Sequence, residues 1–362
     1  MSHSKSKLQI STTGRFENQT SITNASPVLD RSQNIDTHTL IWLDKSYPTD
    51  RPTHMKLRTI IDYLLLYDDI DSCMKYINGS KEQIFLIVSS QFGQTVVSNI
   101  HNLRQLNSVF IKCVCNDTET LEKALVDSLK FYLKQERAMP DLFNHSGIDI
   151  TTNDLRENDW LLELIYVLIR HEPPVDSRNT LIATLSNYYK GNAGQEAVIK
   201  KFSDEYSPEK AIWWYTRDTF IYRLLNKALR QMNVEGILPF HFFIRDLYNQ
   251  LEQEHQKFQS NIKTPIKVYR GQIITRSELE RLNDLSQMSD NNNYISLTSL
   301  ISTTLDQSVA LLFIESRKSN DECDLKSVLF EIDIDLRKKT RPFADIADCT
   351  QFPDEKEVLM MP

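Results

Sequence analysis

Glycine is scarce in this sequence, which excludes the common glycine-rich nucleotide-binding loops. The chain has 8 glycines among 362 residues and contains no Gly-Lys-Ser or Gly-Lys-Thr triplet. A dinucleotide fingerprint and a phosphate loop both need closely spaced glycines where the backbone approaches phosphate. A nucleotide bound by this protein is therefore held by neither a Rossmann turn nor a P-loop.

Cysteine and positive charge are also limited. The 5 cysteines are scattered and lack a zinc-type spacing, so we expect reduced thiols and no metal. Cys113 and Cys115 alternate within an apolar stretch and are interpreted as buried structural thiols. The net charge of −7 argues against a broad nucleic-acid-binding face, because phosphate binding needs concentrated Lys and Arg.

Long apolar runs are absent, and the amino terminus lacks the apolar core of a secretory signal. We therefore expect a cytoplasmic protein without a membrane partner. Residues 1–37 are rich in Ser, Thr, Asn and Gln, with Phe16 as the one aromatic residue. Such a composition predicts a disordered tail.

Residues 38–137 predict a small parallel α/β domain. Continuous apolar runs alternate there with helical patterns, which is typical of buried parallel strands and their crossover helices. The order resembles a receiver-like or flavodoxin-like unit. The apolar runs are 40–43, 84–89 and 109–114, and the helical stretches lie near 57–67, 95–103 and 119–135.

Four polar residues of this domain are expected at the carboxyl ends of strands, where parallel sheets bind ligands. They are Asp44, Ser89, Ser90 and Gln91. An aspartate at such a place is more often a helix cap or a remnant than a phosphoacceptor.

A linker and a helical region are predicted for residues 138–204, and helices continue into the next unit. Ser207 and Pro208 form a helix start signal. Trp213, Trp214, Tyr215 and Tyr222 are interpreted as core residues. The expected helices are 153–170, 177–189, 207–230 and 239–258.

After Pro265 the apolar period changes from that of a helix to that of a strand. A strand runs into Arg270-Gly271, and Asp306 is expected to cap a helix that carries Phe313. Residues 326–335 alternate between apolar and polar side chains. Helices followed by strands predict an α+β unit.

Three chemically suggestive features lie in this second unit. Arg270-Gly271 ends a strand, Ser302-Thr303-Thr304 precedes a helix, and Glu355 and Glu357 stand two apart in the closing stretch. If both carboxylates belong to one strand, its period of two puts them on one face. Each feature alone is weak, since each is common on ordinary protein surfaces.

Together, and in this order, the features resemble the Arg–Ser–Glu signature of arginine-specific mono-ADP-ribosyltransferases, the clostridial-toxin and ecto-enzyme class. The segments VYRGQ, LTSLISTTLDQSVALLF and FPDEKEVLMMP carry the resemblance over residues 205–362. It implies a helical lobe followed by a split β-sandwich. It also implies a further core strand after Pro362, so we expect truncation there. The preceding α/β domain looks like an accessory domain of multidomain invertebrate members.

The resemblance implies roles for the site residues. Glu357 would stabilise positive charge on the ribose, and Arg270 would hold the diphosphate. The Gly271 backbone would bind the nicotinamide amide. Ser302, with Thr303 and Thr304, would hold Glu357 or the ribose. Thr304 departs from the family, which usually has Ser there.

The resemblance also points to the acceptor. Glu355 would attract an arginine guanidinium and take its proton, and Phe313 would either stack on nicotinamide or pack in the core. The expected activity is transfer of ADP-ribose from NAD, as co-substrate, to an accessible arginine of a protein. An NAD glycohydrolase and a catalytically silent interaction protein remain as alternatives.

Overall fold

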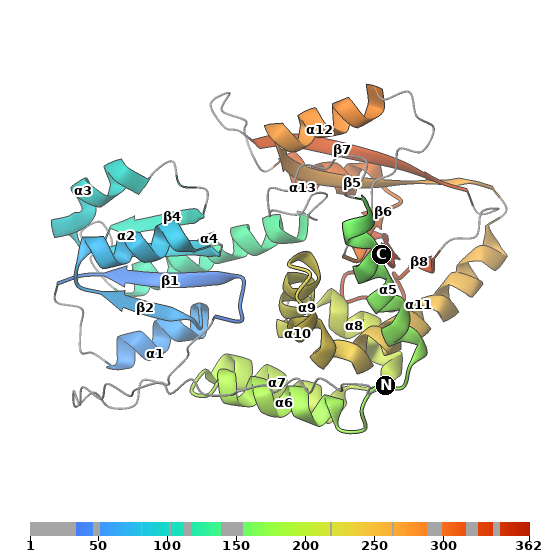
Figure 1. Ribbon diagram of the computed structural model, residues 1–362, viewed down its shortest axis with the longest axis horizontal. Helices are drawn as coiled ribbons and strands as arrows, with labels where there is room; N and C mark the ends of the chain where they lie inside the picture. Colours follow the sequence, from blue (N-terminus) through green and yellow to red (C-terminus); the bar gives the residue numbers. More distant parts are fainter. Residues whose placement is uncertain are drawn as a thin grey trace, which may run out of the picture. The chain divides into compact units, whose positions relative to one another are not determined.

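The computed structural model describes most of the chain after residue 33 (Figure 1). The described residues are 34–45, 51–80, 82–100, 103, 105–111, 118–138, 155–217, 219–262, 264–287, 299–315, 325–335 and 341–362. The predictions for residues 1–33, for the linker at 139–154, and for Cys113 and Cys115 lie outside this set.

The first domain contains a four-stranded parallel sheet in the order β2-β1-β3-β4. Its apolar strands are buried from both sides. Helices α1 and α4 cover one face, and helices α2 and α3 cover the other. The elements are β1 His38–Leu43, α1 Arg51–Ile60, β2 Leu64–Tyr67, α2 Ile70–Gly79, β3 Gln83–Val88, α3 Ser90–Ile100, β4 Leu106–Ile111 and α4 Thr118–Ala138.

The helix expected over residues 57–67 is wrong in its second half. Helix α1 ends at Ile60, and Leu64–Tyr67 forms the edge strand β2 beside β1. An apolar run of this length fits a short strand as well as a buried helix, so pairing with β1 decides the outcome.

The helical region begins with α5 Leu155–Arg170, α6 Ser177–Tyr188 and α7 Ala193–Glu205. The single helix expected over 207–230 is instead divided. It consists of a 3-10 turn at Pro208–Lys210, α8 Ala211–Thr216 and α9 Phe220–Arg230. Arg217 and Thr219 adopt extended backbone angles between the two α-helices, which ends the helical hydrogen bonding. A short helix α10 Val234–Ile237 and a 3-10 turn at Leu238–Phe240 then lead into α11 His241–Asn261.

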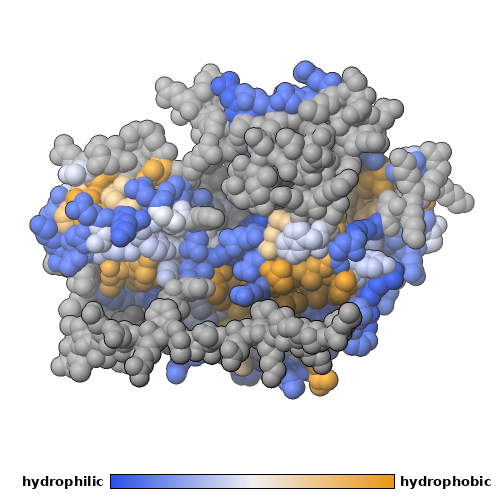
Figure 2. All heavy atoms as spheres, viewed as in Figure 1, coloured by the Kyte–Doolittle hydropathy of each residue, from blue (hydrophilic) through white to orange (hydrophobic). Residues whose placement is uncertain are grey.

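The second sheet is antiparallel, with five strands in the order β7-β5-β6-β9-β8. Helix α13 packs on β5, and α12 has a largely hydrophilic surface (Figure 2). The elements are β5 Ile266–Thr275, α12 Arg276–Gln287, β6 Ile301–Thr304, α13 Gln307–Glu315, β7 Leu325–Ile334, β8 Phe343–Asp345 and β9 Glu357–Met360.

One core joins the helical region to this sheet. Trp214, Phe220 and Phe243 are fully buried, and they share a cluster with Leu359 of β9 and Ala344 of β8. The helical lobe therefore packs against the edge of the sheet that carries the closing stretch of the chain.

Residues 34–37, which were included in the predicted tail, contact the helical region, and Asp36 and Thr37 are buried. Asp36 is 3% exposed, and its carboxylate accepts hydrogen bonds from Arg223 at 3.2 Å and from Tyr189 at 3.0 Å. This partnering lets the acidic side chain be buried. Within the described ranges, no helix combines the length and apolar character that crossing a bilayer requires.

Candidate active site

Strand register brings the three sequence features together at the centre of the antiparallel sheet. Thr304 of β6 pairs with Tyr269 of β5 on one side and with Glu357 of β9 on the other. Arg270 is the next residue on β5, and Ser302 lies two residues earlier on β6. Residues nearly ninety positions apart in the sequence thus become neighbours.

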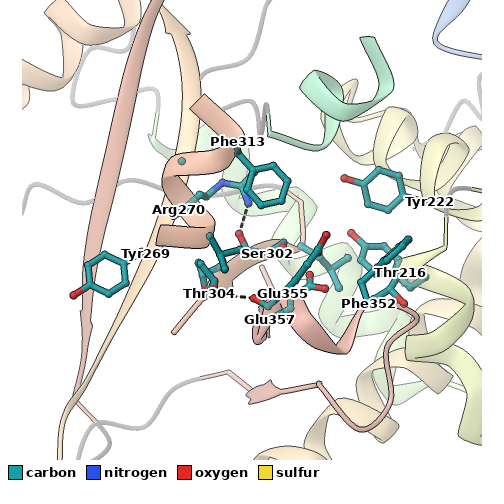
Figure 3. A pocket seen from close by; sticks show the side chains of 16 residues that line it. Thr216, Tyr222, Tyr269, Arg270, Ser302, Thr304, Phe313, Phe352, Glu355 and Glu357 are labelled. Carbon is teal, nitrogen blue, oxygen red and sulfur yellow. Dashed lines mark hydrogen bonds between the residues drawn. The ribbon is translucent and has the colours of Figure 1, made fainter. Parts of the chain in front are cut away.

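All predicted residues of this site line one pocket (Figure 3). Its empty volume is about 810 Å³, a figure that includes space open to solvent. The predicted residues in its wall are Arg270, Gly271, Ser302, Thr303, Thr304, Phe313, Glu355 and Glu357.

Arg270 supplies the positive charge of the pocket. Its Nη1 donates a hydrogen bond to the Ser302 carbonyl oxygen, which fixes the guanidinium over β6. Burial lowers the pKa of Arg270, while Tyr222 and Glu357 act in the opposite direction. Because the ordinary pKa of a guanidinium is so high, Arg270 stays charged.

Glu357 is the buried carboxylate of the pocket. It begins β9, and only 8% of the residue is exposed. Burial, followed by the neighbouring Tyr222, raises the pKa of Tyr215 well above its usual value, and the charge of Glu357 adds to this effect. The pocket therefore places a buried acid near a fixed cation.

Glu355 reaches the same pocket by a different route from the one predicted. Strand β9 begins at Glu357, whereas Glu355 ends a 3-10 turn that begins at Pro353. Lys356 between them is left-handed, with φ 46° and ψ 46°. The premise that both carboxylates share one strand face is wrong, because the turn breaks the strand alternation. Both side chains nevertheless line the pocket.

Thr303 and Thr304 connect β6 to the closing stretch of the chain. The Thr303 hydroxyl donates to the Val358 carbonyl oxygen at 2.8 Å. The Thr304 hydroxyl donates to the Glu355 carbonyl oxygen, also at 2.8 Å. These hydroxyl groups hold the backbone that carries the two carboxylates.

Gly271 has a packing role as well as a place in the pocket wall. A Cβ atom at this position would lie 1.9 Å from the Ala310 carbonyl oxygen and 3.2 Å from Ile314 Cγ2. Both neighbours belong to α13, so glycine lets this helix approach β5 closely.

Aromatic residues form part of the pocket wall. Phe313, a predicted site residue, is half-buried and lies beside Arg270 (Figure 3). Other aromatic residues of the wall were not expected there. Tyr215 and Tyr222 come from α8 and α9 and had been interpreted as core residues. Both line the pocket, as does Phe352, and their rings are in contact at 5.4 Å between centroids. The spacing of Tyr215 and Tyr222 in the sequence is that of core residues, so it did not indicate a place in the pocket.

The polar residues of the first domain lie where they were expected. Asp44 and Ser89 directly follow β1 and β3 and are buried, at 4% and 7% exposure. Their backbone N–H groups donate to Tyr67 and Leu43 respectively, and Ser90 and Gln91 are exposed in the first turn of α3. Across the described ranges, no group of three or more His, Cys, Asp or Glu side chains could hold a metal ion.

Comparison with known families identifies the second unit. Residues 193–361 match the ADP-ribosyltransferase exoenzyme model, which is just under half of the chain. No curated protein and no solved structure matches the chain. The match begins with α7, whose Phe202 packs on Trp214 and Phe220.

Over residues 193–361 the chain is similar to ADP-ribosyltransferase exoenzymes, and this similarity supports transfer of ADP-ribose from NAD. The Arg270–Ser302–Glu357 pocket lies inside the matched segment.

Proposed function

We propose that this protein transfers ADP-ribose from NAD to arginine side chains of proteins and releases nicotinamide. The observation that carries the proposal is the pocket that unites Arg270, Ser302, Glu355 and Glu357 within the ADP-ribosyltransferase domain. Two carboxylates are needed because the reaction has two different demands, cleavage of one bond and activation of an acceptor.

Glu357 serves the cleavage step. The bond between nicotinamide and ribose breaks, nicotinamide leaves with the bonding electron pair, and positive charge develops on the ribose as in glycoside hydrolysis. A buried carboxylate stabilises that charge more strongly than one in water. The 8% exposure of Glu357 suits this task.

Arg270 serves binding. Its guanidinium is held in place by the Ser302 carbonyl oxygen, and a guanidinium is the side chain whose planar set of donors matches a diphosphate. Phe313 and Tyr222 contribute aromatic surface to the same pocket. The pocket thus offers a cation for phosphate and rings for a planar base, which fits NAD.

Glu355 serves the acceptor. A guanidinium is cationic and a poor nucleophile, so a carboxylate must orient it and accept a proton as its nitrogen bonds to the ribose carbon. Glu355 is more accessible than Glu357, since it lies in the turn before β9. A protein arginine can therefore reach Glu355 while Glu357 remains covered.

We also propose the domain division of the sequence analysis, with an accessory α/β domain over 38–137 and a catalytic domain over 205–362. The strand order β2-β1-β3-β4 supports a flavodoxin-like or receiver-like origin for the accessory domain.

Substitution of Glu355 tests the acceptor. The purified protein is incubated with labelled NAD and agmatine, a small guanidine, and both labelled agmatine and free nicotinamide are measured. Glu355→Gln keeps the shape but cannot accept the proton. We expect transfer to fall at least 100-fold while nicotinamide release without agmatine stays within about threefold, since general-base catalysis contributes roughly 10²–10⁴-fold.

Two results would contradict the proposal. If the unmodified protein releases nicotinamide and never labels agmatine, it is an NAD glycohydrolase. If Glu355→Gln lowers both activities equally, the division of roles between the two carboxylates is wrong.

A further inference from the structure

Lys356, between the two carboxylates, has an unusual backbone conformation. In the described part of the chain, Lys356 and Met232 are the non-glycine residues with positive φ, at 46° and 52°. Left-handed angles are unfavourable for a residue with a Cβ and persist where neighbouring contacts hold them. The contacts around Lys356 therefore need an explanation.

Three contacts fasten the turn around Lys356 to the segment between β6 and α13. The Thr304 hydroxyl donates to the Glu355 carbonyl oxygen at 2.8 Å. The Leu305 N–H donates to the Lys356 carbonyl oxygen at 3.3 Å. Lys356 Nζ lies 3.1 Å from Asp306 Oδ2. Consecutive residues 304–306 thus hold consecutive residues 355 and 356.

Asp306 is well suited to this contact because its two carboxylate oxygens have different partners. Oδ1 accepts from the Ser308 N–H at 3.0 Å and from the Ser308 hydroxyl at 2.6 Å, which caps α13. Oδ2 remains for Lys356. The Ser308 hydroxyl and then Lys356 lower the pKa of Asp306 to about 2, so its carboxylate is ionised at neutral pH.

We propose that the Asp306–Lys356 ion pair is a latch that positions Glu355 at the pocket. The latch holds the left-handed turn that ends the 3-10 segment, and this turn aims Glu355 at the pocket although it lies outside β9. The inference rests on the proposed function. It makes Asp306 and Lys356 positioning residues that set how much ADP-ribose reaches arginine instead of water.

Glu357 does not depend on the latch. It pairs with Thr304 in the strand ladder, and the Thr303 hydroxyl holds the next residue, Val358. Loss of the ion pair therefore releases Glu355 and spares Glu357. Because Lys356 is 57% exposed and Asp306 33% exposed, the pair adds little to global stability.

The test compares variants of the full chain. Lys356→Met removes the charge and keeps the length of the side chain, whereas Lys356→Arg keeps the ion pair. Asp306→Asn removes the charge and retains a good helix cap. Lys267→Met is the matched control, because Lys267 forms a partly exposed ion pair with Glu331 at 3.0 Å on the same sheet.

Two quantities are measured for each variant. One is the ratio of agmatine labelling to nicotinamide release from labelled NAD. The other is backbone hydrogen exchange at Leu305 and Glu355, whose N–H groups donate to Lys356 and Phe352. Hydrogen exchange at these two positions measures how stable the turn is, even if the protein has no activity on NAD.

We expect Lys356→Met and Asp306→Asn to lower the ratio about fivefold or more, with nicotinamide release changed less than twofold. Exchange at Leu305 and Glu355 should accelerate, while Lys356→Arg and Lys267→Met should resemble the unmodified protein. Unchanged exchange and an unchanged ratio in Lys356→Met would overturn the latch, as would an equal loss of both activities. Absence of turnover in the unmodified protein would instead contradict the proposed function, and hydrogen exchange would still decide the latch.

Discussion

Arg270 and Gly271 are adjacent residues of β5 with different tasks. Arg270 turns its guanidinium toward β6 and the pocket, whereas Gly271 makes room for the backbone of α13. The resemblance implied that the Gly271 backbone would bind the nicotinamide amide. The packing gives a second reason for glycine, because α13 carries Phe313 and approaches β5 at this point.

Substitution of Gly271 tests the packing. Gly271→Ala should lower the free energy of unfolding by about 1–3 kcal/mol, the usual cost of overpacking, because the added Cβ would lie 1.9 Å from the Ala310 carbonyl oxygen. Denaturant unfolding measures the change. The control is Gly79→Ala, where no atom lies within 4 Å of the added Cβ. Equal stability of the two variants would contradict the close approach of α13.

Most of the candidate site could be predicted at the scale of single residues. Arg270, Ser302 and Glu357 lie on β5, β6 and β9, and their order in the sequence carries the resemblance described above. The turn at Lys356 could not be predicted, since a left-handed lysine depends on tertiary contacts with Thr304 and Asp306. Tyr222 could not be assigned to the pocket from the sequence, because an aromatic residue on an amphipathic helix is usually a core residue.

At the scale of elements, breaks were harder to predict than the elements themselves. The apolar run 64–67 is a strand because β1 offers it a partner, and the helix over 207–230 breaks at Arg217. Neither break is marked by glycine or proline. The cation–π contacts of Arg217 with Trp213 and Trp214, at 4.4 and 5.3 Å, accompany the second break and are local to the end of α8.

Helix α9 is joined to the segment before β1 by a buried ion pair. The side chains of Arg223 and Asp36 are 9% and 5% exposed. Burial alone would raise the pKa of Asp36, but Arg223, His38 and the Tyr189 hydroxyl outweigh it, and the pKa is lowered from 3.8. Arg223 directly follows Tyr222 of the pocket, so this contact also supports the site.

Removal of Arg223 should therefore be costly. We expect Arg223→Met to lower the free energy of unfolding by about 3–5 kcal/mol, because a buried carboxylate loses its charge partner. The control is Lys200→Met, whose exposed pair with Asp204 should contribute far less to stability. A small loss in Arg223→Met would contradict the burial of this pair.

The pH dependence of stability is a second test of the contact between Arg223 and Asp36. Because the folded-state pKa of Asp36 lies below its unfolded value of 3.8, the carboxylate stabilises the fold above that pH. The contribution disappears as pH falls through the lower folded-state pKa. The stability difference between Arg223→Met and the unmodified protein should therefore shrink in acid, which denaturant unfolding at several pH values measures.

At the scale of the whole molecule, the chain contains a parallel sheet and an antiparallel sheet with separate hydrophobic cores. The mixed α/β content could be predicted because the apolar period changes near Pro265. The matched family model covers residues 193–361 and so gives no function for the first domain. What the structure adds is how the first domain contacts the helical region. Those contacts reach α9 through Lys227, whose Nζ lies 3.3 Å from Glu82 Oε1.

The central claim is that the Glu357 pocket cleaves NAD and delivers ADP-ribose to a guanidine. The most direct measurement incubates the full chain with labelled NAD and agmatine and compares it with Glu357→Gln. We expect labelled agmatine from the unmodified protein, and a loss of at least about 100-fold in both labelling and nicotinamide release in the variant, since a group that stabilises transition-state charge contributes roughly 10²–10³-fold. Labelling and nicotinamide release that persist in Glu357→Gln, or their absence from the unmodified protein, would contradict the claim.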